Sequence, residues 1–299
     1  MTTATATPPS MEPNKSTNVR VSKGAPEWLR SSFAAAGRVA PDLTASVAAE
    51  LFRSTRRSRP RPGEREVLES AVPSRIAGIQ TWSWGEGPTV LLVHGWNGRA
   101  TQLGAFVPPL LAQGYRVVAF DALGHGDSIG KRSSLPEFAN CIRQVVDELG
   151  GVYAVIAHSL GGAATTYAMQ YGLRVERAVF ISPPADPREF LKIFGTALGI
   201  SEDVRSRVRQ RVERRLGLSM NEMRANTIAP RMSTPLLIIH DRDDKEVPFD
   251  VGRRIAESWP NAELVATEGL GHQRILRDES VRDLAVSFVT AEAQLMNAA

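Results

Sequence analysis

Cysteine is nearly absent from this sequence, since Cys141 is the only one among 299 residues. A single cysteine excludes an internal disulfide framework and a zinc site made of several cysteines. The five histidines have no spaced cysteine or carboxylate partners, so the sequence contains no metal-ligand pattern. Neither a disulfide scaffold nor a metal centre is expected.

Long apolar runs are missing as well. No stretch approaches the roughly 18 apolar residues that a membrane-spanning helix requires, so a transmembrane protein is not expected. The opening segment MTTATATPPSMEPNK has no positive region followed by an apolar one, and it therefore does not look like a secretory signal. It also lacks the arginines of a transit peptide, which leaves the cytoplasm as the expected location.

An excess of one charge occurs at a single place. The net charge is +4, from 36 Lys and Arg against 32 Asp and Glu. The stretch 53–65 alone holds six arginines and one glutamate, so the rest of the chain is close to neutral. A globally basic surface is therefore not indicated, and no nucleic-acid partner is expected.

What is present is the composition of a globular protein, with 42% hydrophobic and 23% charged residues. Residues 1–24 are rich in Thr, Ser and Pro and predict a disordered tail. Residues 25–65 predict an extension of one or two amphipathic helices followed by a basic linker, and Pro41 and Asp42 would start the second helix. We expect these helices to pack on the body of the protein. A weak contact of this extension with a membrane surface is the alternative.

After residue 65, short apolar runs alternate with helical stretches. The apolar runs are 90–93, 116–120, 152–157, 178–181, 236–239 and 263–267. Strands that are apolar throughout and separated by helices indicate a parallel sheet covered on both faces. Two earlier stretches, 66–71 and 76–84, predict antiparallel strands that lead into it. The expected fold class is α/β, with a mostly parallel, doubly wound sheet.

One long interval interrupts this alternation, between the strand ending at 181 and the strand near 236. Its length predicts an inserted helical cap at about 184–232. Within it Val204, Val208, Val212 and Leu216 form one apolar helical stripe, and we expect the six arginines between 205 and 215 to face solvent rather than bind an anion.

Six apolar residues near the start of the cap have two interpretations. They either form a lid over a pocket for a compact acyl group, or they merely pack the cap onto the body. These residues are Phe190, Leu191, Ile193, Phe194, Leu198 and Ile200.

All five histidines follow predicted strands, at the sheet edge where ligands bind in open parallel sheets. They are His94, His125, His158, His240 and His272. One general base suffices for most reactions, so we expect most of them to shape loops.

The strongest local signal is the segment 157–161, Ala-His-Ser-Leu-Gly, between a predicted strand and a predicted helix at 162–171. Small neighbours allow a sharp turn that holds the Ser159 hydroxyl over the sheet edge. The helix N-terminus there supplies free N–H groups and a partial positive charge, which favour a developing anion.

This arrangement resembles the nucleophile elbow of the α/β-hydrolase family, with Ala157 in place of the usual first glycine. The segments 91–98, Leu-Leu-Val-His-Gly-Trp-Asn-Gly, and 120–128, Phe-Asp-Ala-Leu-Gly-His-Gly-Asp-Ser, resemble two further family motifs. The resemblance covers about residues 66–295. It implies an α/β-hydrolase domain over 66–299, in which 184–232 is the variable cap.

The resemblance also implies a catalytic serine, acid and histidine in that chain order. Ser159 is the implied nucleophile and His272 the implied base, because it follows every plausible acid. The backbone N–H groups of Trp96 and Leu160 are the implied oxyanion hole.

The acid is chosen among three aspartates, Asp241, Asp243 and Asp244. The family places its acid four residues before the proline that here is Pro248, which selects Asp244.

The expected activity is that of a serine hydrolase, which cleaves a carboxylic ester or related acyl compound through an acyl-enzyme and needs no cofactor. The expected partner is a small-molecule acyl substrate, without stable membrane insertion. Because this fold hosts many chemistries, other activities stay open. They are thioesterase, aminopeptidase, carbon–carbon hydrolase, perhydrolase, lipase, and ligand binding without turnover.

Overall fold

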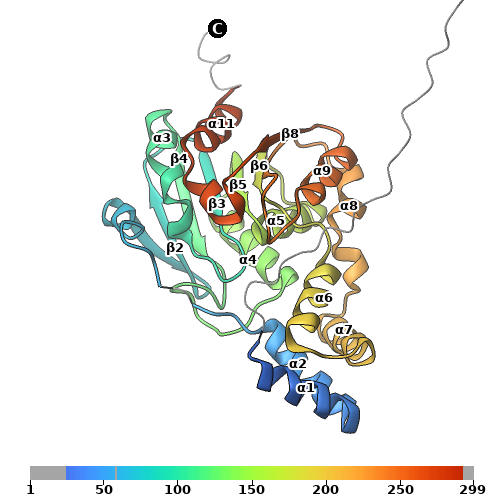
Figure 1. Ribbon diagram of the computed structural model, residues 1–299. Coiled ribbons are helices and arrows are strands. Elements are labelled where there is room, and N and C mark those ends of the chain that lie inside the picture. Colours follow the sequence, from blue (N-terminus) through green and yellow to red (C-terminus); the bar gives the residue numbers. More distant parts are fainter. Residues whose placement is uncertain (1–24, 58, 292–299) are drawn as a thin grey trace, which may run out of the picture.

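The computed structural model describes residues 25–57 and 59–291. Within these residues lies one eight-stranded sheet with the order β1-β2-β4-β3-β5-β6-β7-β8 (Figure 1). β2 pairs antiparallel with β1 and β4, and all remaining pairs are parallel. The strands are β1 (Val72–Ile76), β2 (Ile79–Trp84), β3 (Thr89–Val93), β4 (Arg116–Asp121), β5 (Ala154–His158), β6 (Arg177–Ile181), β7 (Leu236–Asp241) and β8 (Ala262–Thr267).

Helices flank the sheet and extend beyond one end of it. The α-helices are α1 (Glu27–Val39), α2 (Pro41–Arg53), α3 (Val107–Ala112), α4 (Leu135–Glu148), α5 (Leu160–Gln170), α6 (Pro187–Leu198), α7 (Glu202–Leu216), α8 (Ala225–Ile228), α9 (Phe249–Ser258), α10 (Gly271–Arg274) and α11 (Glu279–Thr290). The 3₁₀ helices are η1 (Glu66–Ser70), η2 (Ala100–Phe106), η3 (Met220–Met223), η4 (Ala229–Arg231) and η5 (Ile275–Arg277).

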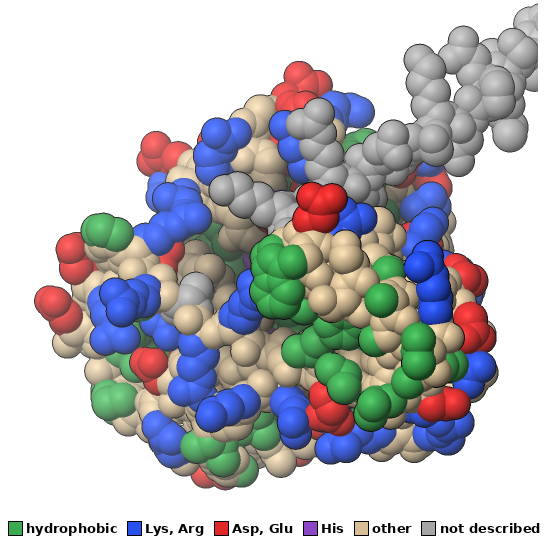
Figure 2. Space-filling model, turned by 60° about the horizontal axis from the view of Figure 1, so that its bottom comes forward, with side chains coloured by type: hydrophobic (Ala, Val, Ile, Leu, Met, Phe, Trp, Pro, Cys, Tyr) green, Lys and Arg blue, Asp and Glu red, His purple; other side chains and the backbone are tan. Residues whose placement is uncertain are grey.

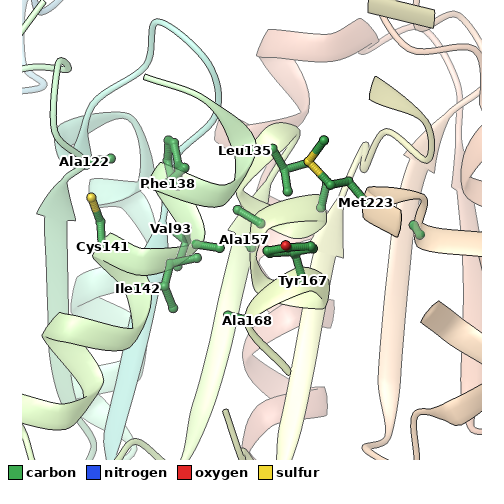
Figure 3. Close-up of a cluster of buried hydrophobic side chains, with 14 of the residues drawn as sticks. Val93, Ala122, Leu135, Phe138, Cys141, Ile142, Ala157, Tyr167, Ala168 and Met223 are labelled. Carbon is green, nitrogen blue, oxygen red and sulfur yellow. The ribbon is translucent and has the colours of Figure 1, made fainter. Parts of the chain in front are cut away.

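The central strands are buried on both faces, as their apolar runs predict. On β3, Leu91 and Val93 belong to the apolar core formed with α4, α5 and α9, whereas Val90 and Leu92 belong to the core formed with α3 and α11. Figure 3 shows the first of these cores, where side chains of α4 and α5 pack over Val93 of β3 and Ala157 of β5. The α/β fold with a doubly wound, mostly parallel sheet is confirmed.

The two antiparallel strands differ from those predicted. Residues 66–71 were expected to be a strand, but Glu66–Ser70 forms the 3₁₀ helix η1. Val67 and Leu68 both pack against the core, whereas consecutive residues of a strand point to opposite faces. The first strand is β1, and a turn at Ala77 and Gly78 divides the predicted strand 76–84. Both turn residues have positive φ, 48° and 85°, which fits a tight two-residue hairpin.

The predicted N-terminal helices are present as α1 and α2, and they lie beside the helices inserted between β6 and β7 (Figure 1). α2 packs along α7, and the rings of Phe52 and Phe194 meet edge to face, with centroids 5.2 Å apart. The predicted tail at residues 1–24 lies outside the described residues.

Three arginines of α7, Arg209, Arg214 and Arg215, are exposed as predicted, whereas Arg205, Arg207 and Arg211 are partly buried. Asp42 of α2 accepts from Arg207 at 3.1 Å and from Arg211 at 2.8 Å, and Arg215 lies 3.7 Å from Glu50. The apolar stripe of α7 is buried as expected at Val204, Val208 and Val212. Part of the arginine face contacts α2, where Asp42 and Glu50 supply the acidic partners. The local pattern of α7 does not reveal this contact, because α2 lies far away in the sequence. Figure 2 shows basic, acidic and apolar side chains intermixed over this end of the molecule.

Among the described residues, no helix is both long enough and apolar enough to cross a membrane.

Candidate active site

Ser159 lies on a sharp turn between the end of β5 and the start of α5. Its φ of 50° and ψ of −124° are rare for a residue with a side chain. Its N–H donates to the Ile181 carbonyl at 2.9 Å, which ties the turn to β6. A Cβ added to Gly161 would lie 2.6 Å from the His94 carbonyl oxygen. Glycine at 161 is therefore required for the helix to pass this close to β3, as the sequence predicts.

The structure brings together Ser159 from the turn before α5, Asp244 from the loop after β7 and His272 from the short helix α10. Ser159 Oγ lies 3.0 Å from His272 Nε2, and His272 Nδ1 lies 2.7 Å from Asp244 Oδ2. All three residues are less than a tenth exposed. Donation from Nδ1–H to the carboxylate leaves the Nε2 lone pair facing the serine hydroxyl, which is the geometry that proton abstraction needs.

The Asp244 carboxylate is held in its ionised form. Burial raises its pKa, but hydrogen bonds from His240 and His272 and from the N–H of Val247 outweigh burial and bring the pKa well below its ordinary value. Oδ1 accepts from the N–H groups of Glu246 and Val247 at 2.8 and 2.9 Å, which leaves Oδ2 for His272. Asp244 therefore offers a fixed negative charge beneath the imidazole.

The other two aspartates hold the loop that carries His272. Asp241 accepts from Thr267 Oγ1 at 2.7 Å and from the N–H groups of Leu270 and Gly271 at 3.1 and 2.9 Å. Asp243 Oδ2 accepts from the N–H of Gly269 at 2.9 Å. The ring nitrogens of His272 instead lie beside Asp244 and Ser159. Asp241 and Asp243 fix the backbone between β8 and α10 and so determine where His272 lies.

The four remaining histidines are buried and contact backbone groups. His158 Nε2 lies 2.9 Å from the His272 carbonyl oxygen, and His240 Nε2 lies 2.9 Å from that of Val247. His94 Nδ1 contacts the Gly95 carbonyl, and its Nε2 accepts from the N–H of Ala122 at 3.0 Å.

Burial lowers the pKa of three of them, to about 4 for His94 and about 3 for His125 and His158. These three are neutral at physiological pH, and all four brace the loops around Ser159.

Leu160 and Trp96 line the cavity beside Ser159. Leu160 is the first residue of α5, so its N–H has no acceptor within the helix. A Cβ added to Gly95 would lie 3.0 Å from Ser159 Cβ, so the loop after β3 passes directly against the serine. Trp96 follows in that loop and lines the same cavity as Ser159 and Leu160. That Trp96 and Leu160 form an oxyanion hole, as the family resemblance implies, stays a prediction.

A cavity of about 440 Å³ opens beside Ser159, within the range typical of small-molecule sites. Three of the six apolar cap residues, Phe190, Ile193 and Phe194, line it, whereas Leu191, Leu198 and Ile200 are buried in packing. Three of the six residues therefore lie over the pocket, and the other three pack the cap onto the body.

The N-terminal extension also lines the cavity, which the sequence does not reveal. Its lining residues are Leu51, Phe52, Arg53, Ser54 and Arg56. No local motif marks them, because their proximity to Ser159 depends on how α2 docks between the cap and α4.

Among the residues described, no group of three or more His, Cys, Asp or Glu side chains is arranged to hold a metal ion.

The comparisons with known proteins agree with this fold. The model of the Alpha/beta hydrolase family matches residues 90–285, about two-thirds of the chain. The chain therefore belongs to the α/β-hydrolase family and is a hydrolase.

Relatives within the family are named for different activities. The 2-hydroxy-6-oxononadienedioate/2-hydroxy-6-oxononatrienedioate hydrolase 1 of Dechloromonas aromatica is 27% identical over 233 residues, which cover 62% of this chain and 80% of that protein. The bifunctional esterase/perhydrolase of Acinetobacter calcoaceticus is 26% identical over 242 residues, covering 64% and 87%. The structure of the Paleococcus ferrophilus monoacylglycerol lipase has a TM-score of 0.57 at 24% identity, covering 71% of this chain and 98% of that one, and supports the fold alone.

Proposed function

We propose that this chain is a serine hydrolase that cleaves a carboxylic ester or related acyl compound through an acyl-enzyme on Ser159. The observation that carries the proposal is the chain of contacts from Ser159 Oγ to His272 and from His272 to Asp244, beside a cavity large enough for a small molecule. A hydroxyl is a weak nucleophile unless an adjacent base removes its proton, and this base is held in one tautomer by a carboxylate.

In the proposed reaction Ser159 Oγ attacks the substrate carbonyl while His272 Nε2 takes the hydroxyl proton. The N–H groups of Trp96 and Leu160 stabilise the oxyanion, and each such donor contributes about 3–4 kcal/mol in measured cases. His272 then protonates the leaving group. Water, deprotonated by His272, attacks the acyl-enzyme, and the acid product leaves with Ser159 regenerated.

Asp244 stays ionised through this cycle. The hydrogen bonds that lower its pKa include the one from His272, so the imidazolium formed in the transition state faces a fixed negative charge. The proposal assigns no step to a cofactor. Residues 25–65 form an extension of the proposed hydrolase domain, and residues 184–232 form its cap. The proposed location of the protein is the cytoplasm.

A second candidate is hydrolysis of a carbon–carbon bond beside a ketone. The Dechloromonas aromatica relative supports it, because the substrate in its name is a hydroxy-oxo diacid without an ester group. The Acinetobacter calcoaceticus relative, an esterase/perhydrolase, supports the first candidate. The two candidate reactions differ in the bond that is broken, which is a carbon–oxygen bond in an ester and a carbon–carbon bond in the diacid.

An activity screen tests the proposal. The purified full chain is assayed with acyl esters, thioesters, aminoacyl anilides and a vinylogous 1,5-diketone, each with Ser159→Ala as the control. Ester turnover that disappears in Ser159→Ala is expected. Turnover of the diketone without any ester turnover would replace the first candidate by the second, and turnover of esters by Ser159→Ala would contradict both.

A further inference from the structure

One part of the cavity wall beside Ser159 is polar and basic. It lies where the end of α2 meets the start of α4, and its lining residues include Arg53, Ser133 and Ser134. The cap side of the same cavity is apolar, with Phe190, Ile193 and Phe194. A polar patch inside a mostly apolar cavity fixes the orientation of a ligand.

Arg53 is the main charged group in this patch. It is 5% exposed, and its Nη2 donates to Glu137 Oε1 at 2.7 Å. Its Nε and Nη1 are buried, and among the described residues they have no acceptor. An arginine side chain has five N–H donors, of which Nε and Nη1 carry three. Buried donors without acceptors are costly, so these donors need an acceptor from water or from a ligand.

Ser133 adds a second unpaired polar group at the same place. It is 1% exposed, and its Oγ has no hydrogen-bond partner in the part of the chain that the structure describes. Its N–H donates to the Arg53 carbonyl at 2.9 Å, so the two residues are neighbours. The 14-residue helix α4 begins just beyond, and its first residues, Leu135 and Pro136, line the cavity. The positive end of the helix dipole therefore adds to the charge of Arg53.

The acidic side chains nearby do not neutralise all of the positive charge in this patch. Glu137 pairs with Arg53, but Arg56 also lines the cavity from its exposed side. Asp186, the acidic side chain among the described lining residues, already accepts from Arg188 at 2.9 Å and lies 3.1 Å from Arg224. The cavity can therefore accommodate one more negative charge.

We propose that Arg53, Ser133 and the start of α4 form a subsite for a carboxylate of the substrate, so that the preferred substrates are acyl compounds with a second, free carboxylate. This inference rests on the proposed hydrolysis at Ser159. A carboxylate supplies acceptors for the unpaired Arg53 donors and for the Ser133 hydroxyl, and the aliphatic part between it and the reacting carbonyl packs against the apolar cap. The N-terminal extension, which supplies Arg53, thereby determines substrate specificity.

A matched pair of substrates tests the subsite. The 4-nitrophenyl ester of glutaric acid has a free distal carboxylate, and the corresponding methyl-capped diester is neutral. The ratio of their kcat/KM values is expected to favour the anion by about tenfold or more, the scale of a charge-assisted hydrogen bond in a buried site. Arg53→Gln should reduce this ratio by about the same factor.

Three further variants separate recognition from loss of structure. Glu137→Gln removes the neutralising charge and should raise the ratio, which a merely structural role of Arg53 does not predict. Ser133→Ala should lower it by a smaller factor than Arg53→Gln. Arg38→Gln, an equal charge change at an exposed site of α1 outside the cavity lining, should leave it unchanged. Circular dichroism verifies the fold of each variant, and Glu137→Gln and Ser133→Ala keep the test decisive if Arg53→Gln does not fold.

A binding measurement distinguishes failure of the subsite from failure of the proposed function. Isothermal titration compares glutaramate, which has one free carboxylate, with neutral glutaramide. Glutaramate is expected to bind the wild-type chain more tightly, and Arg53→Gln should remove the difference even if neither ester is hydrolysed. Equal kcat/KM values for the two esters, together with equal affinities for glutaramate and glutaramide, would overturn the inference. A preference for the anionic compounds that Arg53→Gln retains would also overturn it.

Discussion

Phe52 of the N-terminal extension and Phe194 of the cap meet edge to face, with ring centroids 5.2 Å apart and an interplanar angle of 65°. Both rings line the cavity beside Ser159. Together with the ion pairs of Asp42 to Arg207 and Arg211, this contact fastens the extension to the cap. The far wall of the cavity is thus made by two segments that lie more than a hundred residues apart in the sequence.

The first prediction concerns acyl length. Esters of short to medium acyl chains should have higher kcat/KM than palmitoyl esters, and emulsified lipid should bring no interfacial activation, because the cap is held by α2. Phe52→Ala should shift the optimum toward longer chains, with each additional buried methylene contributing about 0.8 kcal/mol, or roughly fourfold in kcat/KM.

A series from acetyl to palmitoyl esters measures this effect. Val47→Ala is the matched control, because Val47 lies on the same helix, is 47% exposed and is not among the cavity-lining residues. A steady rise of kcat/KM to the longest chain in the wild-type protein would exclude the compact pocket and favour a lipase.

The second prediction concerns the acid. Asp244→Asn should lower kcat by about 10³–10⁴, because an amide leaves the imidazole in the wrong tautomer. Asp241→Asn and Asp243→Asn should lower kcat far less, since these carboxylates contact the loop before His272 and not its ring. Steady-state kinetics of the three variants decides between them. If Asp243→Asn were the severe one, the acid would be wrongly assigned.

The third prediction concerns pH and stability. The pKa of Asp244 lies below its ordinary value of 3.8 in the folded protein, since burial, which raises it, is outweighed by hydrogen bonds. A depressed pKa stabilises the fold above the unfolded value and loses this effect as the pH falls. Asp244→Asn should therefore reduce the free energy of unfolding most near neutral pH, and the difference from wild type should shrink below about pH 4.

Urea unfolding at several pH values measures that difference, with Asp147→Asn, a change at an exposed position of α4, as the control. A difference between wild type and Asp244→Asn that is the same at pH 3 and pH 7 would contradict the stabilising role of the ionised carboxylate.

The sequence predicts those features of the fold that depend on residues close together in the chain. The small residues around Ser159 predict its sharp turn, and the fully apolar strands predict a sheet covered on both faces. The segment Glu66–Ser70 was predicted wrongly, because its two inward apolar residues are consecutive and fit a tight helical turn rather than an alternating strand. Arg53 and Phe52 could not be assigned to the cavity, since only the docking of α2 on α4 and the cap brings them there.

Covalent labelling by a fluorophosphonate identifies the nucleophile, which we propose is Ser159. We expect one adduct, located by mass spectrometry on Ser159, in the wild type and in Ser182→Ala, a control at which the native serine also follows a strand with φ of 50°. Folded Ser159→Ala should acquire no adduct and show essentially no turnover. An adduct that persists in folded Ser159→Ala, or that maps to another residue in the wild type, would show that Ser159 is not the nucleophile.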